Sequence, residues 1–199
     1  MRFGCLFALA LLAAPGAAAA QDPAEREAMI REMQERARVA TTPGKYHEAL
    51  DYYIGEWDVE LAMVMPGAPP QRSPGRATYE WLIEGRWVMQ RVEAVEFMGV
   101  PYYGATIIGY DNFARNHVAA SVSNVDTALN VVRGVVVDPN DRVTALYGTL
   151  DEYTTGELAK PYKVVTRVVD RNHHTIEVWD LGIGPNGAKV LQFDYTRRR

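Results

Sequence analysis

Apolar and polar residues alternate with a period of two along most of the chain after residue 55, which predicts β-strands rather than helices. The apolar positions of the first such run are Trp57, Val59, Leu61 and Met63. A second run spans about residues 77–83, and the same pattern recurs between turn signals to the end of the chain. The later strands are expected at about 86–97, 102–110, 117–124, 128–137, 142–151, 162–169, 174–181 and 188–197.

These runs make roughly ten strands, joined by short segments rich in Gly, Pro, Asp and Asn. Pro66 to Gly75 and Thr154 to Pro161 are the longest of these segments and are expected to be loops. Regularly spaced short strands are typical of antiparallel sandwiches and barrels. Because closure removes exposed sheet edges, we predict an all-β fold with a single up-and-down antiparallel barrel over residues 45–199.

The segment before the strands follows a different pattern. Asp22 and Pro23 are an N-cap followed by proline at the first helical position, and neither Gly nor Pro recurs until after Ala40. Residues 21–44 are therefore expected to form a helix and a linker. The helix has only a thin apolar stripe, which favours loose attachment to the barrel. A short helical turn is expected over Lys45 to Ile54, directly before the first strand.

The first 20 residues have the features of a secretory signal peptide. Arg2 precedes an apolar stretch, and Ala18 and Ala20 form a small-residue cleavage pattern before Gln21. The apolar stretch is too short to span a membrane, which takes about 20 consecutive apolar residues. We therefore expect the protein to be periplasmic or secreted, without stable membrane insertion after cleavage.

Composition narrows the possible chemistry. The only cysteine, Cys5, lies in the expected signal peptide, so the mature chain would have neither a disulfide nor a thiolate site. Cleavage after Ala20 would leave a net charge of 20 − 25 = −5. No basic patch suggests nucleic acid as a partner. Oligomeric state is left open.

The two ends of the predicted barrel carry a specific combination of residues. Gly55 and Trp57 begin the first strand, and Arg197 ends the last. In an up-and-down barrel these strands pair antiparallel, so their ends lie side by side. We predict that the Arg197 guanidinium covers the Trp57 ring as a cation–π plug, and we call Gly55, Trp57 and Arg197 the floor.

Gly-x-Trp on strand one, with an Arg from the last strand, resembles the signature of the calycin superfamily of lipocalins and fatty-acid-binding proteins. A wider set of motifs resembles a bacterial family catalogued as domain of unknown function 1579. Those motifs are His47 and Leu50, Gly55-x-Trp57, the run 80–86 (EWLIEGR), the run 98–104 (MGVPYYG), Gly109-Tyr110-Asp111 and Tyr195-x-Arg197. The resemblance implies a calycin-like fold, often with an export signal, and no established reaction. The family commonly has an aromatic and an acidic residue where this chain has Ser121 to Asn124, so a family site there is not carried over.

The predicted inner face is rich in large apolar side chains, which either fill the barrel or line a pocket for one small molecule. Both interpretations stay open. The candidate lining residues are Leu61, Met63, Tyr79, Trp81, Tyr103, Trp179 and Phe193. We predict non-covalent binding of a small lipophilic or aromatic molecule, with no cofactor.

Two other functions are open from the sequence. An enzyme could use a polar group at the barrel mouth, for which Asp111 and the histidines are the candidates, although Asp111 is more simply a turn residue. The helix from Pro23 to Ala40 could instead dock a partner protein. Neighbouring His173 and His174 point to opposite faces of a strand, so no metal site is predicted. A haem held by one histidine, His174 or His117, is a smaller possibility.

Overall fold

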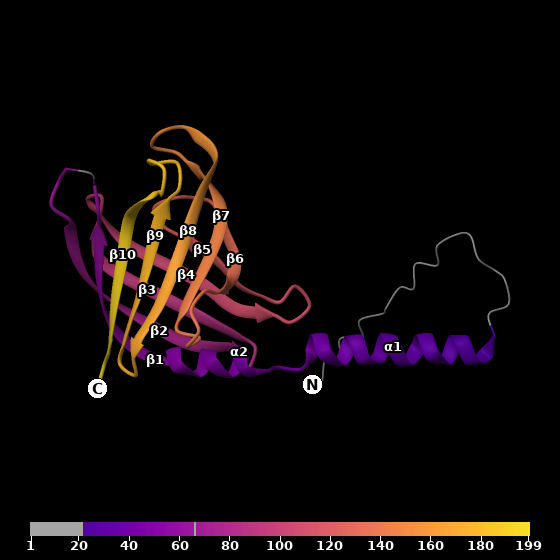
Figure 1. Ribbon diagram of the computed structural model, residues 1–199. Coiled ribbons are helices and arrows are strands. Elements are labelled where there is room, and N and C mark those ends of the chain that lie inside the picture. Colours follow the sequence, from indigo (N-terminus) through magenta and orange to yellow (C-terminus); the bar gives the residue numbers. More distant parts are fainter. Residues whose placement is uncertain (1–21, 66) are drawn as a thin grey trace, which may run out of the picture. The chain divides into compact units, whose positions relative to one another are not determined.

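The computed structural model describes residues 22–65 and 67–199 (Figure 1). The expected signal peptide lies outside these residues. The chain divides into two units, one ending at Arg38 and the other comprising Val39–Arg199, and each is described by itself. None of the helices in the described part is long and apolar enough to cross a membrane.

Helix α1 spans Pro23–Thr41, as the sequence predicts. The Asp22 carboxylate caps it by accepting a hydrogen bond of 3.0 Å from the Ala24 amide. Ion pairs at i,i+4 spacing, Glu27 with Arg31 and Glu32 with Arg36, run along its exposed surface. The expected helical turn before the barrel is also present, as α2 (Lys45–Glu48) and the 3₁₀ helix η1 (Ala49–Tyr53).

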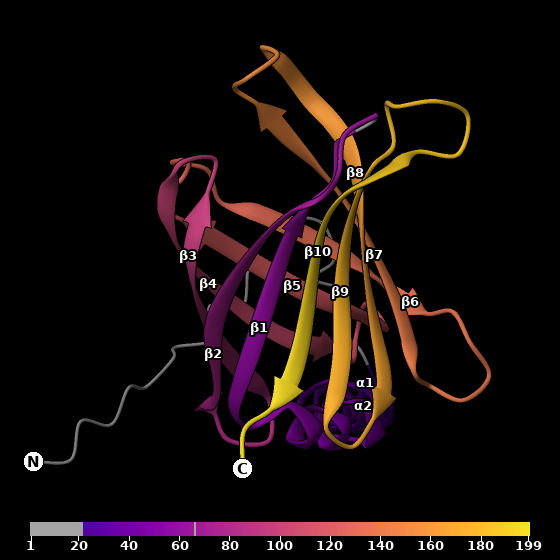
Figure 2. The same ribbon diagram turned by 90° about the vertical axis from the view of Figure 1, so that its left-hand side faces the viewer.

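Ten antiparallel strands form one closed barrel in which each strand pairs with its neighbours in sequence and β1 also pairs with β10 (Figures 1 and 2). The predicted fold class is therefore confirmed. The strands are β1 (Gly55–Met63), β2 (Gln71–Ile83), β3 (Trp87–Phe97), β4 (Val100–Asp111), β5 (Asn116–Ser123), β6 (Asn130–Val136), β7 (Val143–Glu152), β8 (Glu157–Asp170), β9 (His173–Asp180) and β10 (Ala188–Arg197).

Two predicted loops are too long. Strand β2 begins at Gln71 and β8 at Glu157, so Pro74 and Pro161 lie inside strands. Pro74 pairs with Glu60 of β1, but β2 pairs with β3 only from Gly75 onward. Pro161 likewise pairs with β7, while the pairing of β8 with β9 begins at the next residue. Each proline thus has a ladder partner on one side only, where its missing N–H costs least.

The barrel closes as predicted. In the register of β1 with β10, Trp57 lies directly opposite Arg197. The guanidinium carbon of Arg197 lies 4.2 Å from the centre of the Trp57 ring, which is fully buried. This is the geometry of a cation–π contact.

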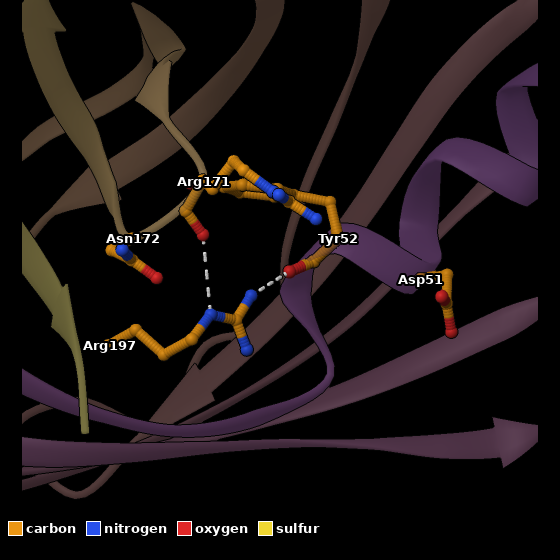
Figure 3. Close-up of a pocket in the computed structure, with 5 residues that line it drawn as sticks. All are labelled: Asp51, Tyr52, Arg171, Asn172 and Arg197. Atoms are coloured by element: carbon orange, nitrogen blue, oxygen red, sulfur yellow. Dashed lines mark hydrogen bonds between the residues drawn. The ribbon is translucent and has the colours of Figure 1, made fainter. Parts of the chain in front are cut away.

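The Arg197 guanidinium also ties together two backbone segments at the floor, the end of η1 and the β8–β9 turn. It donates hydrogen bonds to the carbonyl oxygens of Tyr52 and Arg171 (Figure 3), and also to that of Ile54. Trp57 Nε1 donates to the Tyr53 carbonyl at 2.8 Å. Gly55 has φ +125°, and a Cβ there would lie 3.2 Å from Arg197 Nη1, so glycine leaves room for the guanidinium. The plug therefore joins β1, β10, η1 and the β8–β9 turn.

Two separate clusters of buried side chains line opposite walls. The larger belongs to β1–β3, β10 and η1 and consists of Leu50, Trp57, Val59, Ala77, Tyr79, Val88, Val92 and Tyr195. The smaller belongs to β6–β8 and consists of Val132, Leu146 and Tyr162.

Replacing Trp57 by alanine should destabilise the protein by about 3 to 5 kcal/mol, because it leaves a large cavity and removes the surface on which Arg197 rests. Urea denaturation followed by circular dichroism measures this change. Phe113→Ala is the control, since that ring is 85% exposed, and it should change the free energy of unfolding by less than about 1 kcal/mol. Equal effects of the two substitutions would contradict the plug.

Candidate functional site

A buried polar network lies just above the floor, inside the barrel. The Gln90 amide nitrogen donates hydrogen bonds to the hydroxyls of Tyr79 and Tyr195, at 2.7 and 2.8 Å. The Tyr79 hydroxyl shares a further hydrogen bond of 3.1 Å with His174 Nε2. All four side chains are buried. The network joins β2, β3, β9 and β10 at one level. It makes the part of the interior next to the floor polar.

His174 is enclosed on several sides. Its ring stacks on Tyr195 at a centroid distance of 4.3 Å and meets the Trp57 ring edge-on at 4.5 Å. Burial, followed by the nearby His173 and Arg197, lowers the pKa of His174 to about 3. The imidazole is therefore neutral at pH 7. Nδ1 is buried and has no hydrogen-bond partner among the described residues.

The inner face of the barrel is sealed on one side and open to solvent on the other. Inward-facing positions of β1–β3 are mostly buried, as Leu61, Ala77 and Val92 show. On β4, β5 and β8–β10, which we call the open wall, several inward-facing side chains keep intermediate exposure, namely Thr106, Ile108, Ala119, Ser121, Val164, Ile176, Val178, Leu191 and Phe193. In a closed barrel, an inward-facing side chain is reached by solvent through the lumen. These inward-facing side chains are thus partly accessible to solvent.

A line of polar side chains crosses this open wall. Thr106 on β4 lies opposite Ser121 on β5, which in turn lies opposite Asn130 on β6. Opposed residues of neighbouring strands point to the same face, so all three point inward. Thr106 is also paired with Gln90 of the buried network. We call Thr106, Ser121 and Asn130 the polar row.

The end of the barrel opposite the floor, the mouth, carries a buried ion pair. Lys160 Nζ lies 2.7 Å from the Asp180 carboxylate and 3.1 Å from Glu157. The Lys160 and Asp180 side chains are only 12% and 10% exposed. Both carboxylates raise the pKa of Lys160. The lysine is therefore charged and neutralised by its own neighbours.

A family model described as "Protein of unknown function (DUF1579)" matches residues 42–197. The chain belongs to this family. The match covers the whole barrel together with α2 and η1, so the floor, the polar row and the mouth are all parts of the DUF1579 domain. No curated protein matches the chain.

Three solved structures are similar to the DUF1579 barrel. Rv2717c from M. tuberculosis has 16% identity and a TM-score of 0.51, with 79% of this chain and 100% of that chain covered. The redesigned β-barrel b11L5F_LGL has 10% identity and a TM-score of 0.39, covering 76% and 96%. A de novo designed fluorescence-activating β-barrel has 10% identity and a TM-score of 0.42, covering 75% and 97%. Rv2717c supports the barrel fold and nothing more specific.

Five of the seven predicted lining residues point inward. Leu61 and Tyr79 are buried, and Tyr79 belongs to the polar network. Trp81 lies near the floor end of β2, packed against the larger core. Phe193 and Met63 are partly exposed on the inner face. Of these five, only Phe193 and Met63 therefore reach the open part of the interior.

The prediction is wrong in orientation for Tyr103 and Trp179. Tyr103 is 53% exposed and lies opposite the outward-facing Glu93, whereas its neighbour Tyr102 points inward. With two adjacent tyrosines, the sequence alone does not show which one faces the core. Trp179 lies on the outer face, with Lys163 Nζ 4.7 Å from its ring centre. Here a signal was available, because apolar Ile176 and Val178 alternate with Thr175 and Glu177.

The residues proposed for catalysis or for haem binding do not lie at the mouth of the barrel. Asp111 lies at the floor end of β4, where its carboxylate accepts hydrogen bonds from the Phe113 and Ala114 amides as a turn residue. His174 and His117 also lie at that end. Tyr195, Trp57 and Tyr79 occupy the surroundings of His174, and the Tyr46 and Tyr110 rings pack against His117 at 5.2 and 5.0 Å. Neither arrangement fits a haem.

As predicted, His173 and His174 point to opposite faces. His173 Nε2 is hydrogen-bonded to Asp194 outside the barrel, while His174 lies within. In the described part of the chain, no three His, Cys, Asp or Glu side chains gather in a way that could hold a metal ion. The sequence did not predict the polar network, the polar row or the Lys160–Asp180 pair, since each depends on the register between strands.

The low pKa of His174 predicts acid sensitivity. Below about pH 6.5 the unfolded chain binds a proton at His174 that the folded protein does not bind until about pH 3. Stability should therefore fall with decreasing pH across this window, by up to about 1.4 kcal/mol per pH unit from this group. Urea denaturation at pH 7, 6 and 5 measures the slope, and His174→Gln should reduce it. An unchanged slope in the variant would contradict the neutral, buried assignment.

Proposed function

We propose that this protein binds a small lipophilic or aromatic molecule non-covalently in the barrel lumen. The observation that carries the proposal is the partial exposure of inward-facing apolar side chains, such as Ile176, Val178 and Phe193. Apolar side chains left in contact with water inside a barrel gain free energy when a ligand covers them, at about 25 cal/mol per Å². Mostly apolar concave sites with a few polar groups are typical of small-molecule binding.

The division of the interior supports the same proposal. The β1–β3 wall and the floor are tightly packed and supply a rigid base, so the open wall does not have to be stable by itself. We infer space for a ligand between the two separate clusters of buried side chains. We also propose that the chain is exported, because residues 1–20 have the pattern of a signal peptide.

Titration with N-phenyl-1-naphthylamine, an uncharged dye whose emission rises in apolar surroundings, tests binding in the lumen. We expect saturable binding of one dye per chain, with the stoichiometry checked by native mass spectrometry. Ala119→Phe should weaken binding at least tenfold, because Ala119 points into the lumen and phenylalanine would occupy ligand space.

The adjacent Ala120→Phe is the matched control, since Ala120 is on the opposite face of the same strand. It should leave the dye affinity within about twofold of the parent. If Ala119→Phe fails to fold, Val178→Phe places the same ring in the lumen from β9. Absence of binding by the parent protein, or equal effects of the inward and outward substitutions, would overturn the proposal.

A further inference from the structure

The polar row has unused hydrogen-bonding capacity. Thr106, Ser121 and Asn130 are cross-strand neighbours that point into the lumen and are partly exposed. Across the described residues, their side chains have no hydrogen-bond partner, whereas the amide nitrogen of the neighbouring Gln90 donates to two tyrosine hydroxyls. Hydroxyl and amide groups both donate and accept hydrogen bonds. They can therefore bind a neutral polar group from a ligand.

The charges around the lumen also limit which ligands it can bind. Among inward-facing strand positions above the floor in the described chain, Lys160 is the only Lys or Arg, and Asp180 and Glu157 neutralise it. His174 is uncharged at neutral pH, and burial with the nearby His47 lowers the pKa of His117. Asp126, near the Tyr102 hydroxyl at the mouth, adds a negative charge. Among the described lumen residues, no unpaired cation would therefore neutralise a bound anion.

We propose that the lumen selects ligands with an uncharged hydrogen-bonding head group, such as a hydroxyl or carboxamide, held by the polar row, and rejects carboxylates. This inference rests on the proposed binding function and adds the chemistry of the ligand. The physical reason is desolvation. Moving an ion out of water without a counter-ion costs far more free energy than moving a neutral amide that regains its hydrogen bonds in the lumen.

Decanamide and decanoate are the matched probes, because they have the same chain and nearly the same head-group shape but differ in charge. Each is titrated against bound N-phenyl-1-naphthylamine at pH 7. Decanamide should displace the dye at a concentration at least tenfold lower than decanoate. The difference should persist in 0.5 M NaCl, which screens repulsion from the overall net charge of −4 but supplies no cation within the lumen.

The double substitution Thr106→Val and Ser121→Ala removes two hydroxyls from the polar row with little change in shape. It should weaken decanamide binding several-fold and leave the dye affinity within about twofold, which separates loss of head-group binding from loss of the fold. Thr149→Val is the control, because Thr149 is exposed and its neighbours Gly148 and Leu150 face inward. It should change neither affinity.

The outcomes separate this inference from the proposed function. If the dye binds but decanoate displaces it at the same concentration as decanamide, ligand binding stands and selection of a neutral head group is refuted. Tighter binding of decylamine than of decanamide would also refute it and would indicate selection of cations by Asp126 or Asp180. If the dye and every decyl compound fail to bind, both proposals fall.

Discussion

The antiparallel pairing of β1 with β10 places the Arg197 guanidinium on the Trp57 ring, and the arrangement of the interior depends on this contact. It converts a sheet with two edges into a ring and holds η1 and the β8–β9 turn against one end through backbone carbonyls. At that end, His174 is fully buried beside Trp57. A partly exposed open wall can be tolerated because the floor and the β1–β3 wall contribute most of the buried apolar packing.

The sequence predicts the barrel well because its strongest signals are local or lie at the two ends of the domain. Period-two alternation identifies the strands, and the Gly55-x-Trp57 and Arg197 positions are enough to predict closure. The predicted loops were wrong at two prolines, where strand pairing overrides the local turn signal. Pro74 and Pro161 are breakers in isolation, yet each lies where its strand has a ladder partner on one side only. Both strands therefore begin earlier than the sequence predicts.

The candidate site was much less accessible to prediction. Whether Tyr102 or Tyr103 faces the interior is set by the register of β4 against β3, which two adjacent tyrosines leave ambiguous. The polar row depends on two registers in succession, β4 with β5 and β5 with β6, so Thr106, Ser121 and Asn130 look unremarkable in the sequence and form a site only once the sheet is assembled. Their polarity is also easily mistaken for the solvent face of a strand. The register between strands, rather than residue type alone, creates this part of the molecule.

The position of Arg197 has a consequence for the order in which the chain acquires its structure. Its cation–π partner, Trp57, lies 140 positions earlier (197 − 57), and β10 is the last of the ten strands to be synthesised. Until then, β1 has an unpaired edge and the Trp57 ring lacks its cover. Contacts between residues so distant in sequence form slowly, because a long loop must close before they are gained. Until β10 pairs, the open edge of β1 is a template on which a strand of another chain can add.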